Sequence, residues 1–384
     1  MTSRRDIPFG RPDIDDADRQ AVLEVLQQHV LTHGPQCKAF EVEFAAFVGA
    51  PAAVTVSSCM AALHLSHMHL GIGPGDEVIV PAQTHVATVH AVELTGAKPV
   101  FVDCEIHTGN VDLALVEKAI SPRTRAVTVV HFAGIPANMA RLRALADAHR
   151  LKVIEDCALA VGARFQGRHV GLWGKSGCFS FYPVKHMTTG EGGMLISCHT
   201  DELQEMANFR AFNVDRSANR PQAPGVYDVA GVGLNYRMSE MAAALGRSQL
   251  RKMPRFLAAR AANFHTLQSR LRDIPGLQWL DADGEEAQSS HYCLVAMLPG
   301  KMGDKRSEVV ERLKEFGVGV SVYYPQPTPR MSYYRNRYGY DARNFPHAEI
   351  ISDRSIALPV GPHLDATDMH YMGDRLAQLA GEMT

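Results

Sequence analysis

Lys185 is the residue in this sequence with the best setting for a nucleophile. It follows an apolar run, Cys178–Phe181, and Pro183, and it precedes a glycine cluster, Gly190–Gly193. Glycines let the backbone turn tightly and pass close to a ligand. A lysine directed into a partly dry site loses proton affinity and becomes a usable amine. A lysine on a surface turn is the ordinary alternative, so partners are needed before chemistry can be assigned.

Two such partners stand directly after other apolar runs. Asp156 follows Lys152–Glu155 in an apolar setting, where a carboxylate needs a hydrogen-bonding or charged partner. Ser57-Ser58-Cys59-Met60 opens a helical pattern, and the free N–H groups of a helix start suit a phosphate. A plain N-cap by Ser57 or Ser58 is the alternative for that turn.

The elements that must position these residues alternate along the chain. Residues 1–50 carry a helical pattern that Asp13 or Asp15 caps. Helical patterns then separate short apolar runs, which we expect to be strands: Ala53–Ser57, Glu77–Val80, Pro99–Val102, Ala126–Val130, Lys152–Glu155, Cys178–Phe181 and Met194–Ser197. This alternation predicts an α/β fold with a largely parallel sheet, in which ligands bind beyond the carboxyl ends of the strands.

The second part of the chain has a different pattern. A polar stretch, residues 201–234, predicts a helix and a long surface loop, and Ser239–Leu271 predicts a long helix. Beyond it lie the predicted strands Tyr292–Leu298 and Val318–Tyr323 and the predicted helices Arg306–Phe316 and Ala366–Ala380. We therefore expect a large α/β domain over residues 1–250 and a smaller α+β domain over residues 251–384.

The composition excludes several classes of function. The chain has 384 residues and a formal net charge of −2, so no overall field attracts nucleic acid. No apolar run approaches the roughly 20 residues that span a bilayer. The seven cysteines show no C-x-x-C spacing, and His64 and His67 share a helical pattern with apolar residues. We therefore expect no disulfide framework, no metal site and a reducing cytoplasm.

An anion-binding turn, a carboxylate and a reactive lysine at neighbouring strand ends match the three groups of pyridoxal phosphate (PLP) that a protein must bind: its phosphate, its pyridine nitrogen and its aldehyde. The sequence resembles the DegT/DnrJ-type sugar aminotransferases, within the fold type I PLP-dependent transferases, from about Ile7 to the final helix. The segments that carry the resemblance occur in the family's order: Pro8–Pro12, Gly71–Pro81, Thr95–Asp103, Glu155-Asp156, Phe179–Lys185, Gly190–Gly193 and Asn235–Glu240.

The resemblance implies a role for each matching residue. Lys185 forms a Schiff base with PLP and carries the proton between substrate and cofactor. Asp156 pairs with the pyridine nitrogen and keeps it protonated. Ser180 and the Ser58-Cys59-Met60 turn bind the phosphate. Asn235 reaches the phosphate of the neighbouring subunit, which implies a homodimer with shared active sites.

Five positions depart from the family pattern. Cys59 and Met60 stand where Gly and Thr are usual in the phosphate turn. His85 replaces an aromatic residue that stacks on the pyridine ring, and Leu159 replaces a Gln or His that hydrogen-bonds the ring hydroxyl. Pro329 stands where the family has a substrate-side histidine. These changes leave Lys185 and Asp156 intact and bear mainly on the substrate.

The resemblance implies transfer of an amino group from an amino acid, glutamate, to a nucleotide-linked keto-sugar. The segment Asn235–Glu240 is more similar to enzymes that act on a 4-keto-6-deoxyhexose, and the loops Asn213–Tyr236 and Tyr323–Tyr334 are expected to set sugar specificity. A PLP-dependent sugar dehydratase is one alternative, but that relative carries His where Lys185 stands. A non-catalytic PLP-binding regulatory protein is the other alternative.

Overall fold

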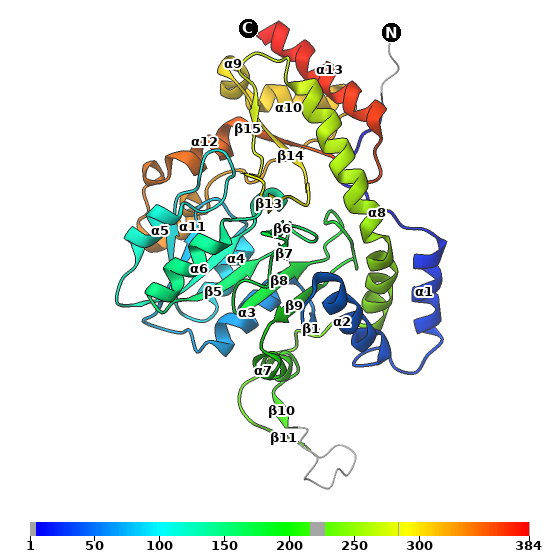
Figure 1. Cartoon of the computed structure of the whole chain (residues 1–384), viewed down its shortest axis with the longest axis vertical. Helices are drawn as coiled ribbons and strands as arrows, with labels where there is room; N and C mark the ends of the chain where they lie inside the picture. The colour runs from blue at the N-terminus through cyan, green and yellow to red at the C-terminus, as the bar shows by residue number, and fades with distance from the viewer. Residues whose placement is uncertain (1–4, 216–226, 283, 384) are drawn as a thin grey trace.

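A seven-stranded sheet forms the centre of the computed structural model, which describes residues 5–215, 227–282 and 284–383 (Figure 1). The strand order is β1-β9-β8-β5-β4-β2-β3, and β9 alone runs against the other six. The predicted strands of the first half are confirmed to within a few residues: β1 (Ala52–Val56), β2 (Glu77–Pro81), β3 (Lys98–Val102), β4 (Thr124–Val130), β5 (Lys152–Asp156), β8 (Ser176–Ser180) and β9 (Gly193–Ser197).

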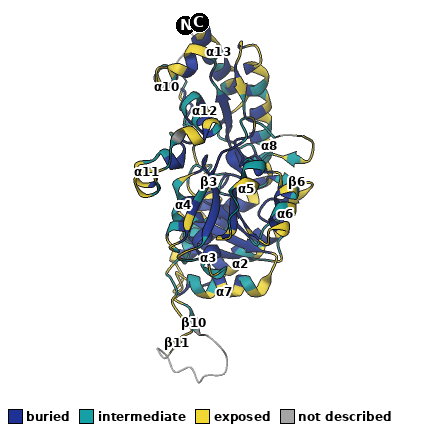
Figure 2. Ribbon diagram, turned by 90° about the vertical axis from the view of Figure 1, so that its left-hand side faces the viewer, coloured by how far each residue is buried: buried dark blue, intermediate teal, exposed yellow. Residues whose placement is uncertain are grey.

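Helices cover both faces of this sheet, which is why its strands are apolar almost without interruption. Successive side chains of a strand point to opposite faces, and Cys178 and Phe179 of β8 accordingly join different hydrophobic clusters. The Cys178 side packs against α3 (Cys59–His69) and α7 (Thr200–Arg210), and the Phe179 side packs against α2 (Pro35–Val48) and the start of α8 (Glu240–Leu271). The strands are accordingly dark in Figure 2, between more exposed helices.

Helix α8 links the large sheet to a smaller one (Figure 1). Its 32 residues, at 1.5 Å each, give a length of about 48 Å. It packs against α1, α2 and, at its far end, α13 (Ala366–Met383). There an antiparallel sheet with the order β12-β14-β15 joins α13 and α10 (Arg306–Glu315) around a separate core. The expected domain boundary at residue 250 falls inside α8 and stays a prediction.

The remaining elements are short or peripheral. Their bounds are α1 (Asp16–Leu26), α4 (Val86–Glu93), α5 (Leu113–Ala119), α6 (Met139–Ala148), α9 (Gly300–Asp304), α11 (Ser332–Tyr338), α12 (Pro346–Arg354), β6 (Arg164–Phe165), β7 (Arg168–His169), β10 (Val214–Asp215), β11 (Asp228–Val229), β12 (Gln278–Trp279), β13 (Ala287–Gln288), β14 (Leu294–Met297), β15 (Ser355–Leu358), η1 (Phe132–Gly134), η2 (Thr328–Arg330) and η3 (Ala342–Asn344). Among the described residues, no helix combines the length and the apolar character needed to cross a membrane.

Two expectations about local structure have different outcomes. Asp15 caps α1, as one of the two predicted cap residues, through a capping box with Asp18. The strand predicted over Val318–Tyr323 does not form. That segment makes only isolated bridges, from Val318 to Ile7 and from Ser321 to Ala357. The Gly319 amide donates to Ile7, whereas Ser321 exchanges hydrogen bonds with Ala357. Because the segment changes partner after one bridge, no continuous ladder develops.

Buried neutral histidines make stability depend on pH. Burial lowers the pKa of His67 and of His169 to about 4, and both side chains are almost completely enclosed. The unfolded chain therefore binds protons below pH 6.5 that the folded chain does not bind until about pH 4. The stabilisation is complete above pH 6.5 and is lost as the pH falls toward 4.

We expect the free energy of unfolding to fall by roughly 1.4 kcal/mol for each pH unit and each such histidine between pH 6.5 and 5. Urea unfolding at pH 7 and at pH 5 measures this, in a range where exposed carboxyl groups stay ionised. Equal free energies of unfolding at the two pH values would contradict it.

Candidate active site

A cavity of about 390 Å³ opens where the parallel strands end. Its wall contains every predicted site residue except Asn235: Ser58, Cys59, Met60, His85, Asp156, Leu159, Ser180 and Lys185. Asn235 is exposed outside the cavity, where its Oδ1 accepts a hydrogen bond of 2.9 Å from Arg237 Nε. Pro329 is buried in η2 and is not part of the cavity wall.

Asp156 is a buried carboxylate at the end of β5, with 5% of its surface exposed. Its Oδ2 accepts a hydrogen bond of 2.7 Å from Thr88 Oγ1, and its Oδ1 accepts one of 3.0 Å from the Ala158 amide. Among the described residues, no lysine, arginine or histidine forms an ion pair with it. A buried anion without a cation is costly, so this site suits a ligand that brings a protonated nitrogen.

Lys185 reaches the same cavity from the turn that follows β8. Its amide donates to the Tyr182 carbonyl at 2.9 Å, which fixes the turn, and its Nζ lies 5.3 Å from the centre of the Tyr292 ring. Burial lowers the pKa of the Lys185 ammonium below its ordinary value. A larger share of the side chain is therefore in the nucleophilic neutral form than for a lysine in water.

The start of α3 forms the third part of the cavity. Ser58 is the N-cap, and its hydroxyl accepts from the Ala61 amide at 3.1 Å. The cap leaves the first amides of the helix, those of Cys59 and Met60, to face an anion. Both expectations for this turn therefore fit together, because the Ser58 side chain caps the helix while the backbone stays available. Ser180, at the end of β8, lines the same cavity.

His85 and Leu159 stand where the resemblance implies a residue that stacks on the cofactor ring and a residue that hydrogen-bonds the ring hydroxyl, and both line the cavity. His85 caps α4, with Nδ1 accepting from the Ala87 amide at 3.2 Å, and its ring centre lies 5.6 Å from that of Tyr324. Its partial enclosure lowers its pKa, so the ring is neutral at neutral pH. Leu159 is buried and offers only apolar contact.

Several residues of the cavity were missed in the sequence. Tyr323, Tyr324, Glu191 and Thr84 also line it, and Thr88 bonds to Asp156 behind the wall. Thr84 and Thr88 are four residues apart at the start of a helix that follows a strand, and that spacing was an available signal. Tyr323 and Tyr324 begin the loop Tyr323–Tyr334, which was expected to set sugar specificity, but neither was predicted individually as a site residue.

A second group of ligand-type residues lies beside β5. The donor atoms of His131, Glu155 and Cys157 all fall within 4.8 Å of one another. However, His131 Nδ1 accepts from the Ala137 amide, so its Nε2 carries the proton that it donates to Glu155 Oε2 at 3.1 Å. Three further amides donate to Glu155. With its donors already committed, the cluster is a structural hydrogen-bond network.

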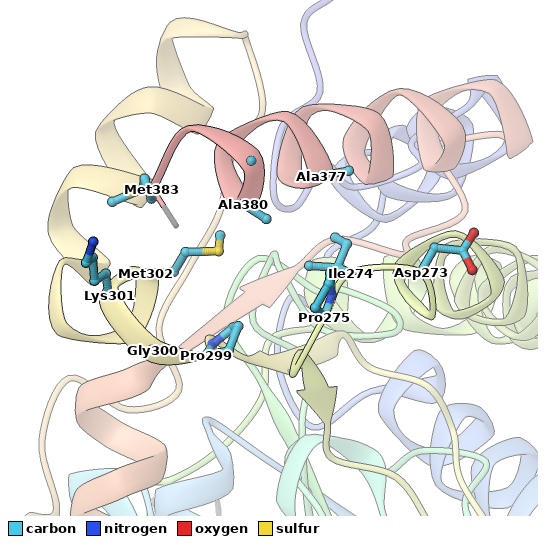
Figure 3. A pocket seen from close by; sticks show the side chains of 11 residues that line it. Asp273, Ile274, Pro275, Pro299, Gly300, Lys301, Met302, Ala377, Ala380 and Met383 are labelled. Atoms are coloured by element: carbon cyan, nitrogen blue, oxygen red, sulfur yellow. The ribbon is translucent and has the colours of Figure 1, made fainter.

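A larger cavity of about 530 Å³ lies in the C-terminal part, between the end of α8, α9 and α13 (Figure 3). Its wall is mostly apolar, and its two charged residues, Asp273 and Lys301, lie on opposite sides of it. In the smaller cavity a lysine, a carboxylate and the start of a helix line one wall together. The smaller cavity is therefore the candidate active site.

Comparison with known proteins identifies the family. The model of the DegT/DnrJ/EryC1/StrS aminotransferase family matches residues 12–377. The chain belongs to this family. It is 37% identical over 369 residues to the spore coat polysaccharide biosynthesis protein SpsC of Bacillus subtilis (strain 168), with 94% of each chain covered.

Two solved structures extend this family assignment to three dimensions. The fold is similar to that of DesV from S. venezuelae, with 33% identity, 94% of both chains covered and a TM-score of 0.87. It is also similar to the PLP form of Spr1654 from Streptococcus pneumoniae, with 27% identity, 99% and 100% of the chains covered and a TM-score of 0.93. The predicted family, α/β fold, aminotransferase class and PLP dependence are confirmed.

Gly193 allows β9 to pass beneath the start of α3. A Cβ at this position would lie 2.5 Å from the Ser58 carbonyl carbon and 2.7 Å from the Cys59 nitrogen. We expect Gly193→Ala to displace the anion-binding turn and to lower the free energy of unfolding by about 1–3 kcal/mol. Gly73→Ala is the matched control, because its Cβ would meet only the Thr95 oxygen at 3.8 Å. Equal urea midpoints for the two variants would refute this packing argument.

Proposed function

We propose that this aminotransferase moves an amino group from glutamate onto a nucleotide-linked keto-sugar, a 4-keto-6-deoxyhexose, with Lys185 and Asp156 as its catalytic residues. The observation that carries the site assignment is the buried Asp156 carboxylate, which has hydrogen bonds but no ion-pair partner among the described residues and shares a cavity with Lys185. The similarity to SpsC, named for polysaccharide biosynthesis, supports a sugar acceptor. The proposed compartment is the cytoplasm, where free thiols such as those of this chain persist.

Bound PLP supplies an electron sink for the negative charge that develops on the carbon next to the reacting nitrogen. In the proposed mechanism the Asp156 carboxylate holds the proton on the ring nitrogen. Lys185 Nζ, neutral in part because of its lowered pKa, anchors the cofactor, takes the proton from the donor carbon and returns it to the sugar carbon. The amides of Cys59 and Met60, together with Ser180, hold the phosphate.

The departures from the family pattern fit a change of substrate more than a loss of chemistry. Met60 and Leu159 make their part of the cavity apolar, whereas Tyr323, Tyr324 and Glu191 offer hydroxyl and carboxylate groups to a sugar. The loop Tyr323–Tyr334 therefore remains the proposed specificity segment. The second proposed loop, Asn213–Tyr236, lies partly outside the described residues, since residues 216–226 are not described.

The test is a panel of amino donors and keto-sugars with the PLP-loaded protein, read by mass spectrometry of the products. We expect an amino-sugar with glutamate as donor, and a loss of roughly 10²–10⁴-fold in rate for Lys185→Ala, because the proton carrier is removed. Lys98→Ala, at an exposed position of β3, is the control lysine. A dehydrated sugar, no product with any pair, or full activity of Lys185→Ala would each overturn the proposal.

The proposed active unit is a homodimer in which Asn235 of one subunit completes the phosphate site of the other. Its exposure outside its own cavity supports this assignment. Mixing inactive Lys185→Ala and Asn235→Ala subunits should restore about one intact site per mixed dimer, because the two defects then fall in the same site. Sedimentation should give twice the mass of the chain. A monomer, or no recovery of activity in verified mixed dimers, would contradict the shared site.

A further inference from the structure

A chain of two buried hydroxyl groups ends on Asp156. Thr84 Oγ1 lies 2.8 Å from Thr88 Oγ1, which lies 2.7 Å from Asp156 Oδ2. Thr84 is 1% exposed and Thr88 is completely buried. Thr84 precedes α4 and Thr88 lies in its first turn. The two residues are at positions i and i+4, so the start of the helix fixes their spacing. Neither residue has a place in the proposed mechanism.

The direction of these hydrogen bonds follows from the chemistry of the groups. An ionised carboxylate only accepts hydrogen bonds, so Thr88 must donate its single hydroxyl proton to Asp156. The Thr88 oxygen then accepts from Thr84, which becomes the outer donor. Hydrogen bonds in such a chain polarise one another and strengthen the bond to the terminal anion. The arrangement holds the orientation of the carboxylate.

The outer end of this chain is tied to the cavity loop. Thr328 Oγ1 donates to the Thr84 carbonyl at 2.9 Å, and the Thr328 amide donates to the Ala82 carbonyl at 2.9 Å. Gln83 Nε2 donates to the Tyr323 carbonyl at 2.8 Å. The segment that places Tyr323 in the cavity wall therefore also fixes the backbone of Thr84.

We propose that Thr88, oriented by Thr84, is a positioning residue that holds the Asp156 carboxylate aimed at the ring nitrogen of the cofactor. The inference rests on the proposed role of Asp156. It assigns to Thr88 an effect on cofactor affinity that acts only through that nitrogen. Removal of the Thr88 hydroxyl should therefore leave the affinity for a ligand without the ring nitrogen unchanged.

The experiment measures dissociation constants of PLP and of its 1-deaza analogue, which carries carbon in place of the ring nitrogen. Thr88→Val keeps the side-chain shape but removes the donor, and Thr88→Ser keeps the donor. A hydrogen bond to a charged group contributes about 1.5–3 kcal/mol, so Thr88→Val should weaken PLP binding about 10–100-fold. Binding of the deaza analogue should be unchanged. Thr88→Ser should stay near wild type, and Thr84→Val should fall between.

Thr128→Val is the matched control, since this equally buried threonine bonds to His67 and does not line the cavity. PLP affinity that falls in Asp156→Ala but not in Thr88→Val would overturn this inference alone. Affinity that is insensitive to Asp156→Ala would overturn the proposed role of Asp156 and the inference with it. Equal losses for PLP and the deaza analogue would reduce Thr88 to a structural residue. If Thr88→Val does not fold, the Thr84→Val comparison decides in the same way.

Discussion

The desolvated carboxylate of Asp156 is the constraint on which the rest of the site depends. Its burial at the end of β5 would be unfavourable without donors, and the fold supplies a hydroxyl and an amide, with no ion-pair partner among the described residues. Those two bonds fix the orientation of the carboxylate. In the proposed function this carboxylate receives the protonated ring nitrogen of the cofactor, and Lys185 borders the same cavity.

Glu155, the residue before Asp156, forms structural hydrogen bonds on the other face of the sheet. Because side chains alternate along a strand, Glu155 points away from the cavity. Its carboxylate accepts hydrogen bonds from the amides of Gly171, Trp173 and Gly174. These residues lead directly into β8, which carries Lys185 just beyond its end. Glu155 therefore anchors the segment that leads into this strand, whereas its neighbour Asp156 lines the cavity.

Local patterns in the sequence predicted the sheet, Lys185, Asp156 and the Ser58-Cys59-Met60 turn, whereas His85, Leu159, Ser180 and Asn235 came from the resemblance to the family. Each site residue except Asn235 follows a strand end, and the common edge of a parallel sheet brings such ends together. Tyr323 and Tyr324 could not be found in this way, since they reach the cavity from the second half of the chain. The composition of residues Val318–Tyr323 predicted a strand. In the structure they bridge to two separate segments, at Ile7 and at Ala357, which local composition does not indicate. The proposed role of Asn235 concerns a second subunit, and its own chain places it outside the cavity.

The least expected residue of the site, Cys59, is compatible with this electrostatic scheme. Its sulfur lies 3.7 Å from Asp156 Oδ1 and 3.3 Å from the Cys178 carbonyl, so the thiol proton has a closer acceptor than the carboxylate. Burial, reinforced by the negative charge of Asp156, raises the pKa of the Cys59 thiol well above its ordinary value. The thiol therefore stays neutral and adds no second negative charge beside Asp156. A side chain at a position where glycine is usual can thus enter the site, because the same desolvation that defines Asp156 keeps its neighbour uncharged.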